Sequence, residues 1–208
     1  MKELLQFLFL VDLSGSMVGE NIAIINAVFQ ECLAELRLLK DSGYFDVRVS
    51  IFTFAEKLVQ IKREEAPDSI AWNDIQITPG ADGFFDIASR KTLYEGLDEL
   101  CSAGGIQDGA GGTHTYIFLF SDGRLVDPAE YGNALHKVKT NNYFLQSVKI
   151  AALTAGAQES NSGFALEFTG GRAENIIPAS EAPQEISKLR LNLYAAGDQS
   201  GLNANEFQ

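Results

Sequence analysis

The stretch from Leu4 to Met17 reads LLQFLFLVDLSGSM, and it decides the fold. Its first part is an apolar run that is too short to cross a membrane and is typical of a buried strand. The run ends at Asp12, and Ser14 and Ser16 follow at intervals of two residues. Because alternate residues of an extended chain point the same way, we expect three oxygen-bearing side chains to face one point beyond the strand.

Outward from this stretch, strand-like apolar segments alternate with segments whose apolar residues recur at helical spacing. Strands are expected at 5–11, 45–54, 116–120 and 148–153, with short ones at 58–61 and 175–177. Helices are expected at 21–40, 92–101, 128–139, 162–168 and 181–195. The alternation predicts an α/β three-layer fold, with a mostly parallel central sheet and helices on both faces.

The length of 208 residues suits one domain, which we place at 1–196, with a polar C-terminal tail at 197–208. Residues 70–91 are expected to be irregular. The glycine-rich segment 104–112 has no Gly-Lys-Ser/Thr ending, so it is interpreted as a connection and not as a phosphate-binding loop.

Two more polar positions stand at expected element ends. Asp122 leaves the apolar strand that precedes it, and Thr92 begins the helix after the irregular segment. Ligands bind such sheets outside the carboxyl ends of the strands. Carboxylate and hydroxyl oxygens suit a hard cation such as Mg²⁺, or Mn²⁺ or Ca²⁺, better than zinc.

Each of these motifs also has a structural interpretation. The Asp-x-Ser-x-Ser pattern can be a loop with helix-capping hydroxyls. Thr92 and Glu95 have the spacing of a capping box, and Asp122-Gly123 alone is typical of a turn. The metal site is predicted because the three motifs occur together, in this order, at the ends of elements of one expected sheet.

The segments FLFLVDLSGSM, TLYEGL and YIFLFSDG resemble the metal-ion-dependent adhesion site of von Willebrand factor A domains. The resemblance covers the chain from Leu5 to about Ala195. It implies a metal site of five residues: Asp12, Ser14, Ser16, Thr92 and Asp122. It also implies the Rossmann-like fold of that family. Among its branches the chain resembles stand-alone bacterial domains of the TerY type, from tellurium resistance.

The chain departs from the family where many members have glycines before the Thr. Here Arg90 and Lys91 precede Thr92. Two cations can repel a metal or attract an acidic partner, and we expect both side chains to point to solvent. Phe84 and Phe85, in the preceding loop, are expected to be buried staples, with contact to a partner as the alternative. These four residues form the candidate partner-binding set.

Composition excludes several classes of function. The formal net charge of -12 disfavours binding to phosphate backbones, so no nucleic-acid partner is expected. Neither membrane insertion nor a signal peptide is expected, so the predicted compartment is cytoplasmic. Cys32 and Cys101 are interpreted as core residues. His114 and His136 lack zinc-ligand spacing, and Trp72 is expected to anchor its own loop.

The resulting hypothesis is a non-catalytic module that binds a protein partner by coordinating the partner's Asp or Glu to a divalent cation, in a bacterial stress-response or signalling complex. One alternative is a metal-dependent phosphatase or hydrolase. A haloacid-dehalogenase-like enzyme needs a second Asp two residues after its nucleophile, and Ser14 stands at that position. The other alternative is a scaffold with a non-functional metal site.

Overall fold

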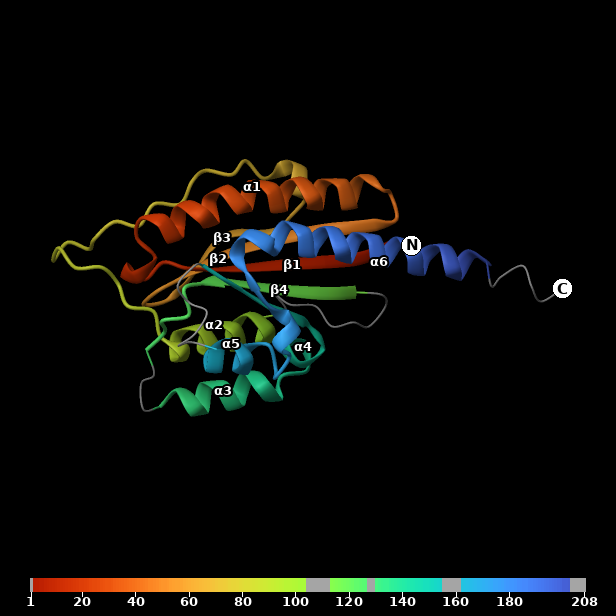
Figure 1. Ribbon diagram of the computed structural model, residues 1–208. Helices are drawn as coiled ribbons and strands as arrows, with labels where there is room; N and C mark the ends of the chain where they lie inside the picture. Colours follow the sequence, from red (N-terminus) through yellow and green to blue (C-terminus); the bar gives the residue numbers. More distant parts are fainter. Residues whose placement is uncertain (1, 104–112, 127–129, 155–161, 203–208) are drawn as a thin grey trace.

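A six-stranded sheet forms the centre of the computed structural model, which describes residues 2–103, 113–126, 130–154 and 162–202 (Figure 1). The strand order is β3-β2-β1-β4-β5-β6, with β3 antiparallel to β2 and the other neighbouring pairs parallel. The strands are β1 (Glu3–Asp12), β2 (Phe45–Phe54), β3 (Leu58–Glu65), β4 (Thr113–Ser121), β5 (Val148–Leu153) and β6 (Ile176–Pro178).

Helices cover both faces of this sheet (Figure 1). On one face lie α1 (Glu20–Asp41) and α6 (Ala182–Leu202). The other face carries α2 (Arg90–Ser102), α3 (Tyr131–Thr140), α4 (Asn142–Gln146) and α5 (Ser162–Phe168). The predicted α/β three-layer architecture is therefore confirmed.

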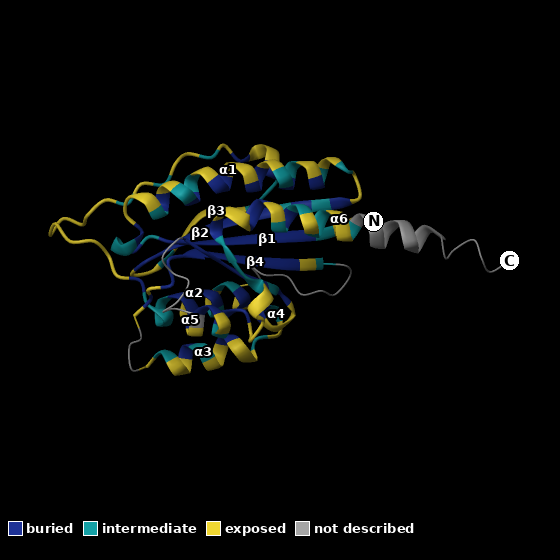
Figure 2. Ribbon diagram, in the orientation of Figure 1, coloured by how far each residue is buried: buried dark blue, intermediate teal, exposed yellow. Residues whose placement is uncertain are grey.

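The apolar run of β1 is continuous because both of its faces are buried (Figure 2). Phe7 and Phe9 point into the core shared with α1 and α6, while Leu8 and Leu10 point into the core shared with α2, α3 and α5. Parallel strands covered on both faces characteristically have such unbroken apolar sequences. Cys32 and Cys101 are buried in these two cores, as expected.

The register brings the ends of the central strands to one edge of the sheet. Asp12 pairs with Phe54 at the end of β2, and Val11 pairs with Phe120 near the end of β4. The segments after β1 and β4 therefore leave the sheet side by side. Residues 70–89, drawn largely in yellow in Figure 1, extend past the same edge.

The observed elements differ from the expected ones at several boundaries. The edge strand β3 continues to Glu65 and not to Ile61, because an edge strand tolerates the charged residues that end its apolar pattern. The short helix α4 was not expected. Helix α6 continues to Leu202, into the segment expected as a tail, and Pro128, the expected helix start, lies outside the described residues. Across the described ranges, no helix is long and apolar enough to cross a membrane.

Candidate metal centre

Asp12 is the most buried polar residue of the candidate site, with no exposed surface. Its Oδ1 accepts a hydrogen bond from the backbone N–H of Ser14 at 2.8 Å, and its Oδ2 accepts one from the Ser121 hydroxyl at 2.7 Å. The hydroxyl oxygens of Ser14 and Ser16 are 3.0 Å apart. The structure thus places the three residues of the first motif together, with the carboxylate held from two sides.

The pKa of Asp12 is raised above its ordinary value. Burial of the carboxylate is the main cause, and the nearby charge of Asp122 adds to it, while hydrogen bonds from Ser121 and Ser14 act in the opposite direction. Asp122 directly follows Ser121, whose hydroxyl contacts Asp12, so the carboxylates at the ends of β1 and β4 lie near each other. Buried, neighbouring carboxylates are an arrangement that a cation stabilises.

Asp122 is also nearly buried, with 3% of its surface exposed. Its Oδ1 accepts a hydrogen bond from the backbone N–H of Arg124 at 2.9 Å, and its Oδ2 lies 3.7 Å from the exposed Arg124 side chain. Gly123, between them, has a φ of 77°, a left-handed conformation that glycine adopts without strain. The turn after β4 thereby folds back over the carboxylate.

Thr92 lies in the first turn of α2 and is not its cap. Ser89 is the N-cap, and its hydroxyl accepts a hydrogen bond from the Thr92 backbone N–H at 3.1 Å. The two hydroxyl oxygens are 2.9 Å apart. The capping-box interpretation of Thr92 is therefore wrong, because the helix begins at Arg90, two residues earlier than predicted.

Backbone hydrogen bonds join the loops that carry the three motifs. Gly15 N–H donates to Asp86 O at 3.0 Å, which ties the loop after β1 to the loop before α2. Val126 N–H donates to Ala88 O at 3.1 Å, and Arg90 N–H donates to Val126 O at 3.1 Å. The segment that leads into Thr92 is therefore held between the segments that follow Asp12 and Asp122.

The donor set fits a hard divalent cation. It offers two carboxylates and three hydroxyls, all oxygen donors. Among the described residues there is no cluster of three or more His, Cys, Asp or Glu side chains that could hold a metal. The candidate metal centre is not such a cluster, because three of its five residues carry hydroxyls and only Asp12 and Asp122 carry carboxylates.

Arg90 does not point to solvent, contrary to expectation. Its side chain is 18% exposed, and its Nη1 lies 3.7 Å from Oε1 of Glu167 on α5. Its guanidinium carbon also lies 5.5 Å from the ring centroid of Tyr131 and 5.1 Å from that of Phe164. Lys91 is more exposed, and its Nζ lies 3.4 Å from a carboxylate oxygen of Glu130.

The two phenylalanines of the loop before α2 are not buried staples: Phe84 is 73% exposed and Phe85 is 40% exposed. Other exposed apolar residues occupy the same loops. We call the whole group the apolar rim: Val18, Phe84, Phe85, Ile87 and Val126. Trp72, in contrast, anchors its loop as expected by stacking on Phe29, with ring centroids 4.1 Å apart.

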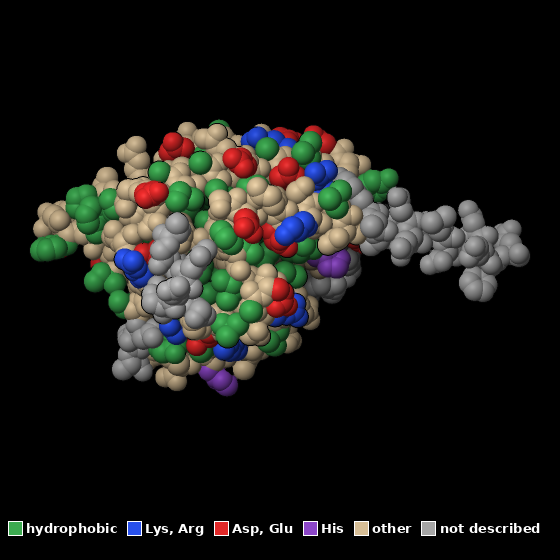
Figure 3. All heavy atoms as spheres, in the orientation of Figure 1, with side chains coloured by type: hydrophobic (Ala, Val, Ile, Leu, Met, Phe, Trp, Pro, Cys, Tyr) green, Lys and Arg blue, Asp and Glu red, His purple; other side chains and the backbone are tan. Residues whose placement is uncertain are grey.

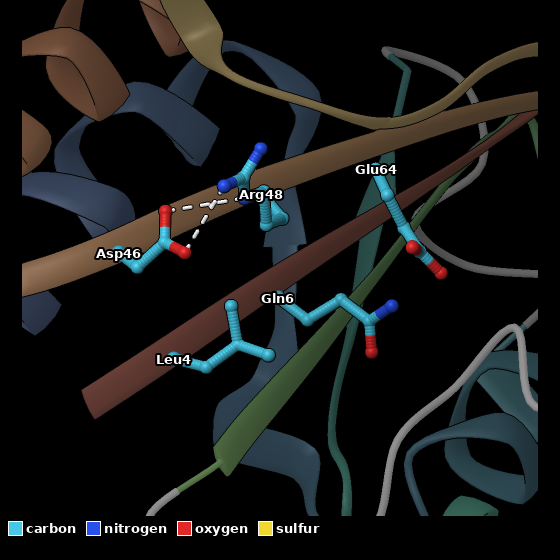
Figure 4. Close-up of a pocket in the computed structure, with 5 residues that line it drawn as sticks. All are labelled: Leu4, Gln6, Asp46, Arg48 and Glu64. Carbon is cyan, nitrogen blue, oxygen red and sulfur yellow. Dashed lines mark hydrogen bonds and ion pairs between the residues drawn. The ribbon is translucent and has the colours of Figure 1, made fainter. Parts of the chain in front are cut away.

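A polar pocket of about 150 Å³ lies at the opposite end of the sheet, near the starts of β1 and β2 (Figure 4). Its walls include Gln6, Arg48 and Glu64. Arg48 is paired with Asp46 through two contacts of 3.1 Å each, so its charge is already compensated. This pocket is separate from the candidate metal centre.

Two supporting residues of the site were not singled out from the sequence. Ser121 orients Asp12, and its hydroxyl also accepts a hydrogen bond from Gly123 N–H at 2.9 Å. Ser89 caps α2 and contacts Thr92. Both signals were present: Ser121 directly precedes Asp122, and Ser89 stands three residues before Thr92, which is capping distance.

The strand order, the helices on both faces and the loops at the carboxyl edge make a three-layer α/β fold, which matches that of von Willebrand factor A-like neighbours. No protein-family model matches the sequence, and no curated protein matches it. Solved structures do match. Proximal thread matrix protein 1 from the mussel byssus has a TM-score of 0.54 and 13% identity over 91% of this chain.

A structure of the same mussel protein with a zinc-occupied MIDAS motif has a TM-score of 0.58 and 13% identity. The chain spans about half, 48%, of that protein's length. The conserved hypothetical protein BatB from Bacteroides thetaiotaomicron has a TM-score of 0.53 and 10% identity, with 92% of this chain and 99% of that one covered. An aerotolerance-related membrane protein from Bacteroides fragilis is similar at a TM-score of 0.52 and 10% identity, over 90% of this chain and 99% of that one. At 10–13% identity, these structures are similar to this chain in fold.

Proposed function

We propose that this protein is a non-catalytic module that holds a divalent cation with Asp12, Ser14, Ser16, Thr92 and Asp122, and uses it to bind an acidic residue of a protein partner. One observation carries the proposal. Backbone hydrogen bonds join the loop after β1, the loop before α2 and the loop after β4, and the buried carboxylate of Asp12 lies where these loops meet. A bound cation would supply a coordination position for an incoming carboxylate. The zinc-occupied motif of the mussel protein supports a divalent metal in general.

The apolar rim supports a protein as the partner. Its members are between 40% (Phe85) and 73% (Phe84) exposed, and they lie on the loops that join at the candidate site. Hydrophobic side chains gather at the end of the molecule where these loops project (Figure 3). Exposed apolar surface next to a polar centre is typical of protein interaction sites.

The sequence and geometry favour binding over catalysis. Ser14 stands where a haloacid-dehalogenase-like phosphatase would need an acid–base Asp, and its hydroxyl contacts Ser16. The alternative of a scaffold with a decayed metal site is disfavoured because all five candidate positions keep oxygen donors. We further propose, from the sequence resemblance, that the cation is Mg²⁺ or Mn²⁺ and that the protein is of the bacterial TerY type.

The test is a thermal melt with and without Mg²⁺ or Mn²⁺. A ligand that binds only the native state raises stability by RT ln(1 + [L]/Kd), which is about 2.7 kcal/mol at a hundredfold excess over Kd. For a chain of this size that corresponds to a rise in Tm of roughly 5–10 °C. We expect the rise in the unaltered protein and its loss in Asp12→Ala.

Asp46→Ala is the matched control, because Asp46 is a half-buried aspartate at the far end of the sheet. Its response to metal should equal that of the unaltered protein. A metal response that persists in Asp12→Ala, or that is absent from the unaltered protein, would contradict the assigned site.

A further inference from the structure

The first turn of α2 carries two residues with opposite effects on a bound metal ion. It carries Thr92, a proposed metal ligand, and it also carries Arg90, a cation two residues away. An uncompensated positive charge two residues from a metal ligand would weaken binding of a divalent cation, since Coulomb repulsion acts over several ångströms inside a protein. The site therefore needs a means to keep the Arg90 charge away.

The structure provides that means in Glu167, at the end of α5. Its Oε1 lies 3.7 Å from Arg90 Nη1, and both side chains are only 18% exposed. The guanidinium is also placed over two aromatic rings, those of Phe164 and Tyr131. Aromatic faces and a carboxylate are favourable surroundings for a planar guanidinium.

Glu167 contacts the same helix a second time. The hydroxyl of Tyr94, which is fully buried, donates a hydrogen bond to Glu167 Oε1 at 2.8 Å. Arg90 and Tyr94 are four residues apart and share one face of α2. Thr92 is about 200° around the helix from Arg90, because each residue turns the chain by about 100°. Fixing the Arg90 face against α5 therefore directs Thr92 to the other side.

We infer that Glu167 is a positioning residue of the metal centre: it holds the Arg90 charge against α3 and α5 and thereby leaves Thr92 free of a competing cation. The inference rests on the proposed function. It adds a residue 75 positions beyond Thr92 to the group that determines metal affinity, and it assigns that residue an electrostatic role.

The experiment measures Mn²⁺ affinity by calorimetry for the unaltered protein, Glu167→Gln, Arg90→Gln and the double variant. We expect Glu167→Gln to weaken Mn²⁺ binding by about fivefold to tenfold, the range for one partly screened charge. The double variant should recover the affinity of the unaltered protein, because removing Arg90 removes the charge that Glu167 compensates. A purely structural role would instead leave the double variant at least as weak as Glu167→Gln.

Lys91→Gln is the matched control, since Lys91 is a neighbouring cation held mainly at the surface by Glu130. It should change Mn²⁺ affinity less than twofold. Melts in chelator report whether each variant is folded, independently of metal binding. Mn²⁺ binding by the unaltered protein together with unchanged affinity in Glu167→Gln would overturn this inference alone. Absence of Mn²⁺ binding by the unaltered protein would overturn the proposed function and this inference with it.

Discussion

At Gly15 the loop after β1 and the loop before α2 come into direct contact. A Cβ atom added to Gly15 would lie 2.7 Å from Cβ of Phe85 and 3.3 Å from its Cγ. Glycine is needed here for close approach and not for an unusual backbone angle, since Gly15 has no positive φ. The same approach lets Gly15 N–H reach Asp86 O. One missing methyl group therefore keeps two loops of the candidate centre together.

We predict that Gly15→Ala lowers the free energy of unfolding by about 1–3 kcal/mol, the usual cost of overpacking a close contact. Phe85→Gly removes the Cβ that the new methyl group meets, so Gly15→Ala should cost less in that background. Denaturant titrations of the four proteins give the comparison. Equal costs in both backgrounds would show that the contact with Phe85 is not the cause.

At the scale of elements, α2 is held close to the sheet edge by another glycine. A Cβ on Gly96 would lie 2.7 Å from Cβ and 2.9 Å from Cδ2 of Leu58 on β3. Gly96 is buried in the middle of α2, where alanine would ordinarily be preferred. The glycine therefore sets the distance between α2 and β3, and with it the position of the helix that carries Thr92.

Gly96→Ala is expected to destabilise the protein by about 1–3 kcal/mol, because the helix must move away from β3 or Leu58 must shift. Gly132 in α3 is the matched control, since nothing lies within 4 Å of a Cβ at that position. Gly132→Ala should stabilise by up to about 1 kcal/mol. The two changes in unfolding free energy should thus have opposite signs, and a gain in stability from Gly96→Ala would contradict the packing argument.

The elements predicted well from sequence are those whose pattern is local. The strands Phe45–Phe54 and Val148–Leu153 have the expected bounds, because β-branched, aromatic and other apolar residues dominate both segments. The placement of Asp12 and Asp122 at the ends of two strands likewise followed from the alternation of strands and helices. The side chain of Arg90 was placed wrongly because its position depends on Glu167, 77 residues later in the chain, and no local pattern reports that pairing.

Phe84 and Phe85 belong to the candidate partner-binding set, but the expectation that they are buried staples was wrong for a related reason. A loop such as 70–89 has no periodicity from which burial can be read. Whether Phe84 or Phe85 is buried depends on what the folded loop meets, and here only Gly15 approaches Phe85 closely among the described glycines. The glycine-rich segment 104–112 lies outside the described residues.

At the scale of the whole molecule, the proposed partner site consists of the metal centre and the apolar rim beside it. We predict that partner binding in Mg²⁺ is lost in chelator, in Thr92→Ala, and when the partner's acidic residue is changed to its amide. The double variant Phe84→Ser and Ile87→Ser should weaken partner binding at least tenfold, because hot-spot side chains each contribute about 1 kcal/mol or more. Its Mg²⁺ affinity should be unchanged, since both side chains belong to the rim and not to the ligand set.

Leu38→Ser is the control for a general loss of exposed apolar surface. Leu38 is 50% exposed near the end of α1 that is remote from the candidate centre. Its substitution should leave partner binding intact. Binding that survives chelator, Thr92→Ala and the rim variant would show that the partner uses another surface.

The loops at the carboxyl edge are held together by main-chain bonds, and this has a consequence for how the protein can change. Leu13 N–H donates to Phe54 O, Gly15 N–H to Asp86 O, and Val126 N–H to Ala88 O. Such bonds are indifferent to the identity of most side chains. Side chains at Ile87 and Val126 can therefore vary while the frame around Asp12 persists. The protein could therefore serve as a scaffold whose rim positions are randomised in a library. Binders selected from it would bind their targets in the presence of metal and release them in chelator.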